Sequence, residues 1–461
     1  MKNSRTIEWD VDIDLLRKYD RPGPRYTSYP TAPQFSDEVG PLKFLQHVSN
    51  PADQHRNLSL YFHIPFCNTL CYFCACTMVI THNRQRIAEY VDYLIREIEL
   101  LSARVGDRLV RQVHWGGGTP NYLTPDEIKR LTEAIHRHYN VANDVEMGVE
   151  IDPRDITEAH LRAFRDGGFN RISMGVQDFH EPTQKAVNRI QPESMTRHYI
   201  ELARSLGFES VNLDFIYGLP YQTPVTFART LDILIGIRPN RIALFNYAHV
   251  PWMKKHQRLM EPETLPRPEQ KLQILKLAIE RLTAAGYVFI GMDHFALPDD
   301  ELAVALRQKT LYRNFQGYST HADCDILAHG ISGISQTPFM YAQNTKDFRQ
   351  YYAALQQGRP ATERGVILDG DDYLRREVIT RLMCDFALRF DQIEQQFEIH
   401  FRDYFRTELS ELDEFIQDGL VEQTDDGITV TQMGRLLIRN IAMTFDKYLR
   451  RAKEVRFSRT V

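Results

Sequence analysis

Cysteine and tryptophan are scarce in this chain, which has six cysteines and three tryptophans among 461 residues. A disulfide-stabilised secreted domain is therefore not expected. Apolar runs are short as well. None approaches the roughly 18–20 residues of a membrane helix, and the first ten residues lack the apolar core of a signal peptide. These absences predict a reduced, cytoplasmic, soluble protein.

Neither sign of charge is in large excess. The chain has 56 Lys and Arg residues against 61 Asp and Glu residues, a net charge of −5. This balance argues against a nucleic-acid surface over the whole protein, although it leaves room for a local basic patch. The length is sufficient for one large domain and a smaller one.

The cysteines that the chain does have are unevenly placed. Four of the six lie within ten residues, at Cys67, Cys71, Cys74 and Cys76. The first three have the spacing C-x3-C-x2-C, which puts three thiolates on one short loop. Three ligands leave a tetrahedral or cubane centre one ligand short, so a cofactor or substrate could take the open position.

Three kinds of site fit such a loop. A structural zinc ion normally has four Cys or His ligands, often in two pairs, and no second cysteine pair follows here. A disulfide is disfavoured by the expected reducing compartment. An iron–sulfur cluster is held by thiolates, and a [4Fe–4S] cluster with three protein ligands would expose one iron, so the bunched spacing favours the cluster. The isolated Cys324 and Cys384 are expected to be ordinary buried thiols.

Residues 57 to 295 alternate between strand and helix patterns. A helix is expected to open at Thr124, with Pro125 in its first turn and Glu127 at the capping-box position. Such repeats predict a parallel sheet with helices outside it. The expected strands are 58–63, 110–115, 145–151, 171–176, 211–216, 242–246 and 289–292, and the other expected helices are 84–104, 156–166, 194–206, 223–236 and 267–285.

Polar residues and glycines recur where the expected strands stop. The cysteine loop follows the first strand, and the turn Gly116-Gly117-Gly118 follows the second. Ligands of such folds bind at the carboxyl ends of the strands, so these residues are expected to share one site. The next three strands end at, or are followed by, Glu150 and Asp152, Gln177 and Asp178, and Asp214.

The rest of the chain has a different pattern. Residues 297–360 are expected to form a loop-rich connection. From about residue 370, helices are expected over 373–386, 392–416 and 433–451, with a short hairpin over 419–431. Helices with a hairpin suggest a winged-helix-like domain, but the charge balance argues against DNA binding. A cover over the site is the preferred interpretation.

Three strings in this sequence resemble a known family, the oxygen-independent coproporphyrinogen III oxidases, which are radical S-adenosylmethionine (SAM) enzymes. They are Tyr61-Phe62-His63-Ile64-Pro65-Phe66-Cys67, Cys71-Tyr72-Phe73-Cys74-Ala75-Cys76 and Gly23-Pro24-Arg25-Tyr26-Thr27-Ser28-Tyr29-Pro30. The resemblance implies a partial, open (β/α)6 barrel, since six units are too few for an eight-fold barrel. It also implies an N-terminal extension at the substrate site (1–50), a radical SAM catalytic domain (51–365) and a mainly helical C-terminal domain (366–461).

The resemblance also assigns the cofactor residues. Cys67, Cys71 and Cys74 would hold a [4Fe–4S] cluster, and SAM would chelate its fourth iron. A second SAM molecule is implied beside the first, with Arg189 and Asp214 serving it. The implied SAM contacts are Tyr61, Phe73, Gly117, Gly118, Thr119, Glu150, Gln177, Arg189, Asp214, Ala248 and Ile334.

The candidate catalytic residues are Cys76, Tyr61 and His63. Cys76 follows Cys74 so closely that both could ligate the same cluster only with strain, which suggests a role near the substrate or in electron or hydrogen transfer. His63, His249 and His294 could act as acid–base groups, although an isolated histidine is more often structural.

The implied reaction is oxidative decarboxylation. An electron from the cluster cleaves SAM, and the resulting 5′-deoxyadenosyl radical takes a hydrogen from the β-carbon of a propionate. Loss of carbon dioxide and one more electron leaves a vinyl group. Two propionates of coproporphyrinogen III would react in this way, giving protoporphyrinogen IX. A flavodoxin- or ferredoxin-like electron donor and a monomeric enzyme are expected, with no nucleic-acid or membrane partner.

The substrate carries four carboxylates, so cationic and hydroxyl groups should line its pocket. The candidates are Arg21, Arg25, Tyr26, Tyr29 and Arg313. A haem-trafficking chaperone built on the same core is the alternative function. Chaperone-type relatives lack the fourth cysteine and the N-terminal string, and both are present here, so the resemblance favours the oxidase.

Overall fold

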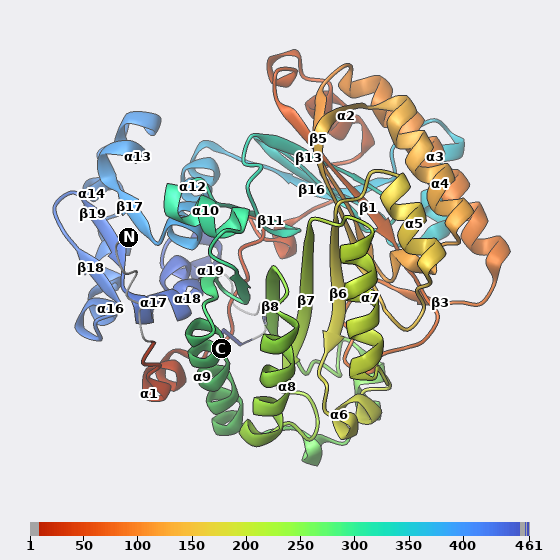
Figure 1. Ribbon diagram of the computed structural model, residues 1–461. Coiled ribbons are helices and arrows are strands. Elements are labelled where there is room, and N and C mark those ends of the chain that lie inside the picture. The colour runs from red at the N-terminus through yellow and green to blue at the C-terminus, as the bar shows by residue number, and fades with distance from the viewer. Residues whose placement is uncertain (1–8, 452–456, 458, 461) are drawn as a thin grey trace.

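A large sheet with a parallel centre organises the molecule (Figure 1). The structure is a computed structural model and describes residues 9–451, 457, 459 and 460. Each of its six central strands pairs parallel with the next, which confirms the expected strand–helix repeat. These strands are β1 (Asn57–Ile64), β4 (Leu109–Gly117), β5 (Asn140–Ile151), β6 (Arg171–Gln177), β7 (Ser210–Tyr217) and β8 (Arg241–Asn246).

Helices cover the outer face of this central sheet, as expected (Figure 1). Helix α4 begins as predicted, because the Thr124 hydroxyl accepts from the backbone N–H of Glu127 and the Glu127 carboxylate accepts from that of Thr124. This capping box satisfies two N–H groups that the helix itself leaves free. The covering helices are α3 (Arg84–Val105), α4 (Pro125–His138), α5 (Glu158–Asp166), α7 (Glu193–Ser205), α8 (Pro224–Ile237) and α9 (Pro268–Ala284), with a short α6 (Glu181–Ala186).

The prediction of a loop-rich connection over 297–360 is wrong. This region adds helices α10 (Glu301–Gln308) and α11 (Phe348–Gln356), a small hairpin of β11 (Tyr312–Asn314) and β12 (Gly317–Ser319), and the sheet strands β13 (Cys324–His329), β14 (Ile334–Thr337) and β15 (Met340–Asn344). Strand β13 pairs parallel with β1. These strands are short and bury polar side chains such as Gln336, Gln343 and Asn344, so they lack the apolar alternation by which a strand is recognised.

The sheet extends beyond its parallel centre at both edges. The edge strands β9 (Val288–Gly291), β10 (His294–Ala296) and β16 (Thr362–Ile367) pair antiparallel. Within the described residues the sheet has twelve strands, in the order β16-β15-β14-β13-β1-β4-β5-β6-β7-β8-β10-β9. No helix of the described part of the chain is both long and apolar enough to cross a membrane.

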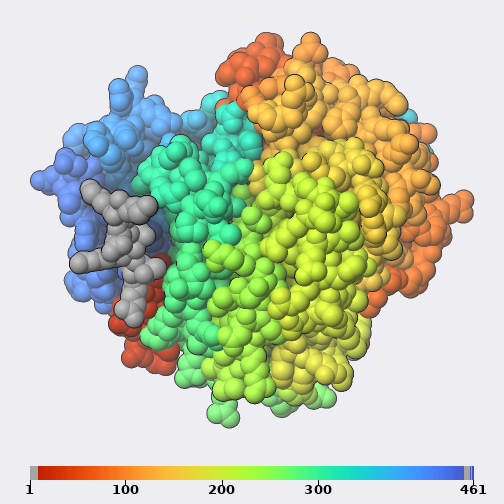
Figure 2. Space-filling view, viewed as in Figure 1, coloured from red at the N-terminus to blue at the C-terminus, as the bar shows by residue number. Residues whose placement is uncertain are grey.

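The C-terminal region is helical with a small sheet, and it occupies one side of the molecule (Figure 2). The predicted hairpin is confirmed as β18 (Val421–Gln423) and β19 (Gly427–Val430), and β17 (Ala387–Arg389), which was not expected, joins it. The long helix predicted over 392–416 is broken, because Glu398 adopts a left-handed φ of 55° that ends its first segment. The region contains α12 (Gly370–Asp385), α13 (Phe390–Phe397), α14 (Phe401–Tyr404), α15 (Arg406–Glu411), α16 (Asp413–Gln417), α17 (Gln432–Leu436), α18 (Ile438–Met443) and α19 (Lys447–Arg451).

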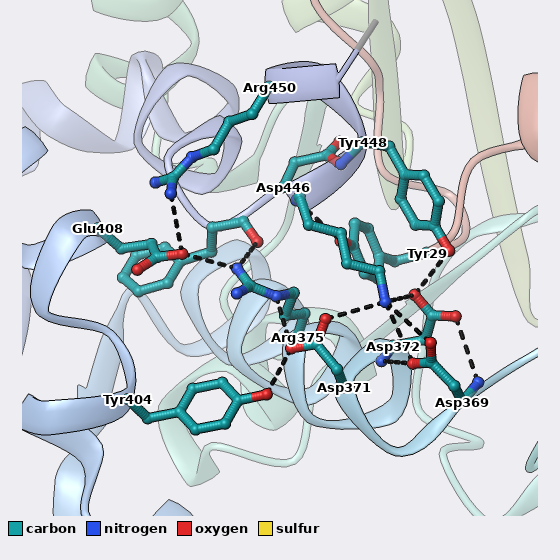
Figure 3. A network of polar contacts seen from close by, with 12 residues as sticks. Tyr29, Asp369, Asp371, Asp372, Arg375, Tyr404, Glu408, Asp446, Tyr448 and Arg450 are labelled. Atoms are coloured by element: carbon teal, nitrogen blue, oxygen red, sulfur yellow. Dashed lines mark hydrogen bonds and ion pairs between the residues drawn. The ribbon is translucent and has the colours of Figure 1, made fainter.

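The last predicted helix, 433–451, is likewise divided into α17, α18 and α19. Leu437 separates the first two with non-helical angles (φ −107°, ψ 19°). A network of polar contacts surrounds the start of α19 (Figure 3). There the Lys447 ammonium lies between Asp369, Asp371 and Asp372 of the α12 N-terminus. Helix α19 therefore begins at a lysine whose ammonium contacts three carboxylates.

The N-terminal segment is attached to this C-terminal region. It contains α1 (Ile13–Tyr19) and α2 (Pro41–Val48), while residues 1–8 of the predicted extension lie outside the described residues. The Arg439 guanidinium donates to the carbonyls of Gly23 and Pro24, and the backbone N–H of Lys447 donates to the Tyr29 hydroxyl. These contacts fix residues 23–30 between the sheet and the C-terminal helices.

Candidate functional site

The cysteine loop and the ends of the parallel strands enclose a common cavity. The loop begins directly after β1, where β2 (Phe66–Cys67) pairs with β3 (Val79–Ile80). The cavity has a volume of about 190 Å³. Its lining includes Cys67, Cys71, Cys74, Cys76, Phe73, Gly117, Gly118, Thr119, Glu150, Asp152, Arg154, Ser173, Gly175, Gln177, Arg189 and Asp214. The expected site at the carboxyl ends of the strands is therefore present.

Two of the three predicted cluster ligands, Cys67 and Cys71, have sulfurs that lie beside polar side chains. The Cys67 sulfur is 3.2 Å from the Thr119 hydroxyl. The Cys71 sulfur accepts from the guanidinium of Arg154 at 3.3 Å and from that of Arg189 at 3.5 Å. Hydrogen bonds from cationic groups stabilise a thiolate, so this surrounding suits anionic sulfur ligands.

The spacing of the three sulfurs suits a centre larger than a single ion. A tetrahedral zinc site with 2.3 Å bonds brings its sulfurs to about 3.8 Å from one another. The sulfurs of Cys67, Cys71 and Cys74 do not all lie within 4.8 Å, whereas one other group in the described chain does satisfy that limit, formed by His321 and Cys324 with Asp323. A cuboidal cluster, whose ligands are farther apart, fits the three thiols better than zinc does.

The glycine turn at the end of β4 lies against the cysteine loop. A Cβ atom on Gly118 would come within 2.7 Å of the Pro65 carbonyl, and one on Gly117 within 2.8 Å of the His63 ring. Gly117 also has a φ of 118°, which L-residues with a side chain rarely adopt. The backbone N–H of Gly118 donates to the Ile64 carbonyl. Glycine is thus required here for the two loops to approach.

Two carboxylates of the cavity differ in charge state. Burial alone would raise the pKa of Glu150, but the hydrogen bond and charge of His114, together with the Gly117 N–H, lower it. The pKa of Asp214 is raised to about 7 by burial and by the charge of Glu150. Glu150 is therefore the anion of this pair, and Asp214 changes charge near neutrality.

A third carboxylate is held by two arginines. Burial would raise the pKa of Asp152, but the charges of Arg189 and Arg154 bring it to about 2. Both guanidiniums lie 2.7 Å from the same Asp152 oxygen. Because each also contacts the Cys71 sulfur, Asp152 positions two cations beside a predicted cluster ligand.

The predicted catalytic residues Tyr61, half-buried, and His63, buried, form a pair behind the glycine turn. His63 Nε2 lies 2.8 Å from the Thr77 carbonyl, an acceptor, so Nε2 carries the proton and donates to it. His63 Nδ1 is then free to accept from the Tyr61 hydroxyl at 3.1 Å. The Tyr61 ring stacks on His114, which contacts Glu150. This chain of contacts reaches the cavity, although neither Tyr61 nor His63 lines it.

Two predicted SAM contacts also lie outside the cavity wall. Ala248 lines a neighbouring pocket. Ile334 packs with Phe35, Tyr341 and Leu368. Their assignment to SAM remains a prediction. Apart from Tyr61, Ala248 and Ile334, the predicted SAM residues line the cavity, and Cys76 lines it beside the three cluster cysteines.

Sequence reasoning missed several residues of the cavity. Arg154 was not singled out, although its place two residues after the strand-ending Asp152 could have drawn attention to it. Ser173 and Gly175 lie within β6 and line the cavity, but neither belongs to a recognisable sequence motif. Asp214, expected at a strand end, lies three residues before the end of β7 at Tyr217, so it is deeper in the cavity than the pattern suggested.

Of the substrate candidates, the two tyrosines are buried and hydrogen-bonded within the protein. The Tyr26 hydroxyl donates to Asp446, and Tyr29 is buried against α19. Arg25 is half-buried and pairs with Asp293. Arg313 is buried with one guanidinium nitrogen unpaired. Arg21 is exposed.

Comparisons with known proteins agree with this geometry. The family model described as Radical SAM superfamily matches residues 61–234, and that described as HemN C-terminal domain matches residues 368–437. The oxygen-independent coproporphyrinogen III oxidases of Pseudomonas aeruginosa and Escherichia coli are each 48% identical to this chain, and each alignment covers 99% of both proteins.

A solved structure supports the same relationship. The coproporphyrinogen III oxidase HemN from Escherichia coli, described as a radical SAM enzyme, matches with a TM-score of 0.91 and 47% identity over 96% of this chain and 100% of that one. Similarity of this extent includes the barrel, the N-terminal segment and the C-terminal helices. The chain therefore belongs to the family of oxygen-independent coproporphyrinogen III oxidases.

Proposed function

We propose that this protein converts coproporphyrinogen III to protoporphyrinogen IX without oxygen, by oxidative decarboxylation of two propionate side chains. Each propionate loses carbon dioxide, one proton and two electrons and becomes a vinyl group. The observation that carries the proposal is the cavity at the strand ends, where three thiols surround an open space in a chain 48% identical to named oxidases. Cytoplasmic location is part of the proposal.

The cavity residues fit a [4Fe–4S] cluster and SAM. The three thiols would hold the cluster, and when both groups are bound they supply one-electron cleavage of SAM and hydrogen abstraction. Glu150, anionic beside the Gly117 N–H, offers an acceptor for the amino or ribose groups of SAM. The glycine turn lets the ligand approach the backbone. Asp214 and Arg189 are available to a second SAM molecule. The electron donor is proposed to be flavodoxin- or ferredoxin-like, and the enzyme a monomer.

Cys76 is proposed to act near the substrate and not as a cluster ligand. Its sulfur lines the cavity, and a hydrogen bond between the two thiols lowers the pKa of Cys74 and raises that of Cys76. Cys76→Ser should retain the iron and sulfide of the wild-type protein after anaerobic reconstitution, whereas Cys71→Ser should lose most of it. Loss of iron from Cys76→Ser would instead indicate that Cys76 is a ligand of the cluster.

The division of the chain near residues 50 and 365 is also a proposal. Strand β16 ends at Ile367 and α12 begins at Gly370, which supports the second boundary. Limited proteolysis that cleaves first between residues 360 and 370 would agree with it, and first cleavage within the strand–helix units would not.

The enzyme activity is tested with the reconstituted protein. Iron and sulfide are measured first, and SAM, a reductant and coproporphyrinogen III are then added without oxygen. Protoporphyrinogen IX, methionine and 5′-deoxyadenosine should accumulate, and Cys71→Ser should form none of them. Stable haem binding with no turnover would contradict the proposal and favour the chaperone.

A further inference from the structure

A second, larger pocket opens beside the cluster cavity. Its volume is about 420 Å³. No carboxylate belongs to its described lining, while three cationic side chains do. The lining residues are Arg25, Gly218, Asn246, Tyr247, Ala248, His249, Val250, Trp252, Leu265, Pro266, Lys271, Phe457 and Arg459. The pocket is therefore built for an anionic ligand with a substantial apolar surface.

Lys271 differs from the other two cations because its charge is unpaired. Arg25 forms an ion pair with Asp293, and Arg459 forms one with Asp20. Among the described residues, the Lys271 ammonium forms no hydrogen bond or ion pair, and the charges that act on it are those of Asp20, which raises its pKa, and Arg459, which lowers it. Its side chain crosses the end of β7, since a Cβ atom on Gly218 would lie 3.0 Å from Lys271 Cε. Burial lowers the pKa of Lys271, as expected for an ammonium without a partner.

Positive charge is also in surplus behind the pocket. Burial and the charges of Arg439 and Arg313 lower the pKa of Arg25 to about 9. Burial and the charge of Arg313 lower that of Arg439 to about 10. One guanidinium nitrogen of Arg313 is buried without a partner. Within the described residues, only the Arg25 guanidinium of these three forms an ion pair with a carboxylate, that of Asp293. A bound anion would relieve the repulsion among the three.

The walls of the pocket are apolar and partly aromatic. Tyr247, Trp252, Leu265 and Phe457 contribute to them, and Trp252 is 57% exposed. A tetrapyrrole macrocycle has large apolar faces that aromatic and aliphatic side chains contact well. The combination of apolar walls and a cationic end matches a tetrapyrrole with propionate arms.

The same loop connects this pocket to the cysteine loop. Residues 247–250 and Trp252 line the pocket, and the residues that follow bond to the cysteine loop. His256 Nε2 lies 2.7 Å from the Cys74 carbonyl, and the Lys254 ammonium lies 3.0 Å from that of Cys76. A ligand in the second pocket therefore shares a wall with the predicted cluster site.

We propose that this pocket is the substrate site and that Lys271, assisted by Arg25, binds the propionate carboxylates of the tetrapyrrole. The inference rests on the proposed function. Lys271 is a specificity-determining residue in this account, because its unpaired ammonium favours a macrocycle with anionic arms over neutral or cationic ones.

The test uses the reconstituted enzyme and coproporphyrin III, the stable aromatic form of the substrate, in anaerobic binding titrations. Lys271→Met should weaken binding by about tenfold, the loss expected for one charge-assisted contact. Lys271→Arg should restore most of it. Lys129→Met, on the exposed face of α4, is the matched control and should bind as the wild type does.

Charge reversal gives a second readout. A porphyrin with four cationic arms should bind the wild type poorly and bind Lys271→Glu better. The KM of Lys271→Met for coproporphyrinogen III should rise, while SAM cleavage without substrate stays at the wild-type rate. Wild-type affinity for both porphyrins in Lys271→Met and Lys271→Glu would overturn the proposal.

The two proposals fail in different ways. If the wild type binds coproporphyrin III through Lys271 but forms no protoporphyrinogen, the site stands and the proposed function fails. If the wild type turns over and Lys271→Met has unchanged affinity and KM, the function stands and the site fails.

Discussion

The guanidinium of Arg154 donates a hydrogen bond of 3.3 Å to the sulfur of Cys71. Asp152 holds that guanidinium through both of its oxygens. A fixed positive charge therefore lies beside one predicted cluster ligand. Hydrogen bonds to the sulfurs and the local net charge set the reduction potential of an iron–sulfur cluster, because a nearby cation stabilises the reduced, more negative state.

Arg154→Gln should consequently lower the reduction potential of the reconstituted cluster. A shift of about 60 mV corresponds to a tenfold change for a one-electron couple, and a shift of that order is expected. The potential is measured by a redox titration of the anaerobic protein. Arg162→Gln, an exposed arginine paired with Glu158 on α5, is the control and should not move it. An unchanged potential in Arg154→Gln would show that the contact has no electrostatic effect on the cluster.

Asp214 should make SAM binding depend on pH. Its pKa is raised to about 7, so it gains a negative charge between pH 6 and 8. SAM carries a sulfonium, and the charged carboxylate should favour it. If SAM lowers the Asp214 pKa by one unit, its affinity rises by about tenfold across this range. Equilibrium binding should show this rise in the wild type and in the exposed control Asp299→Asn, but not in Asp214→Asn. An equal rise in Asp214→Asn would assign it to another group.

The strand–helix repeat was predictable because its signals are local. The capping box at Thr124 and the buried strand at 211–216 are each determined by a few neighbouring residues. The strands β13 to β15 were missed because their signals are not local. Strand β13 pairs with β1, which lies more than 250 residues earlier in the chain. Their buried polar side chains hydrogen-bond to partners that are distant in sequence, as Asn344 does to Glu97.

The candidate site was predictable in part for the same reason. The three cysteines and the glycine turn have fixed spacing and follow strand ends. Arg154 and Lys271 were not singled out, since an arginine in a turn and a lysine on a helix are ordinary in sequence. Only the fold shows that the first contacts Cys71 and that the second crosses Gly218 into a pocket.

Glu97 should make the stability of the protein fall as pH rises toward neutrality. Burial raises its pKa from 4.5 to about 7, against the hydrogen bonds of Gly330, Tyr351 and Asn344. Between these values the folded chain keeps a proton that the unfolded chain has released, so the free energy of unfolding decreases with pH. The contribution is fully present below pH 4.5 and is lost by about pH 7, a change of about 3 kcal/mol.

Denaturant unfolding at pH 5 and pH 8 measures this effect. Glu97→Gln should have a smaller difference between the two pH values than the wild type. Glu99→Gln, an exposed residue of the same helix, should keep the wild-type difference. If Glu97→Gln also keeps it, another group is responsible for the pH dependence.

Lys447 should stabilise the junction between α12 and α19. Its ammonium is 2.8 Å from Asp372, 2.9 Å from Asp371 and 3.1 Å from Asp369 (Figure 3). The Lys447 side chain is 11% exposed and that of Asp372 is 3% exposed. Lys447→Met would leave the buried Asp372 carboxylate without its cation, which should reduce the free energy of unfolding by about 3 kcal/mol.

A double-mutant cycle identifies the pair that matters. Asp372→Asn removes the buried charge, so Lys447→Met in that background should cost much less than it does alone. Lys185→Met, which breaks an exposed pair with Glu181, should change stability by about 0.5 kcal/mol or less. Equal costs of Lys447→Met in both backgrounds would mean that Asp369 and Asp371, which are more exposed than Asp372, carry the interaction. Because Lys447 also donates its backbone N–H to Tyr29, which the substitution preserves, the N-terminal segment and the Lys271 pocket should stay intact in this variant.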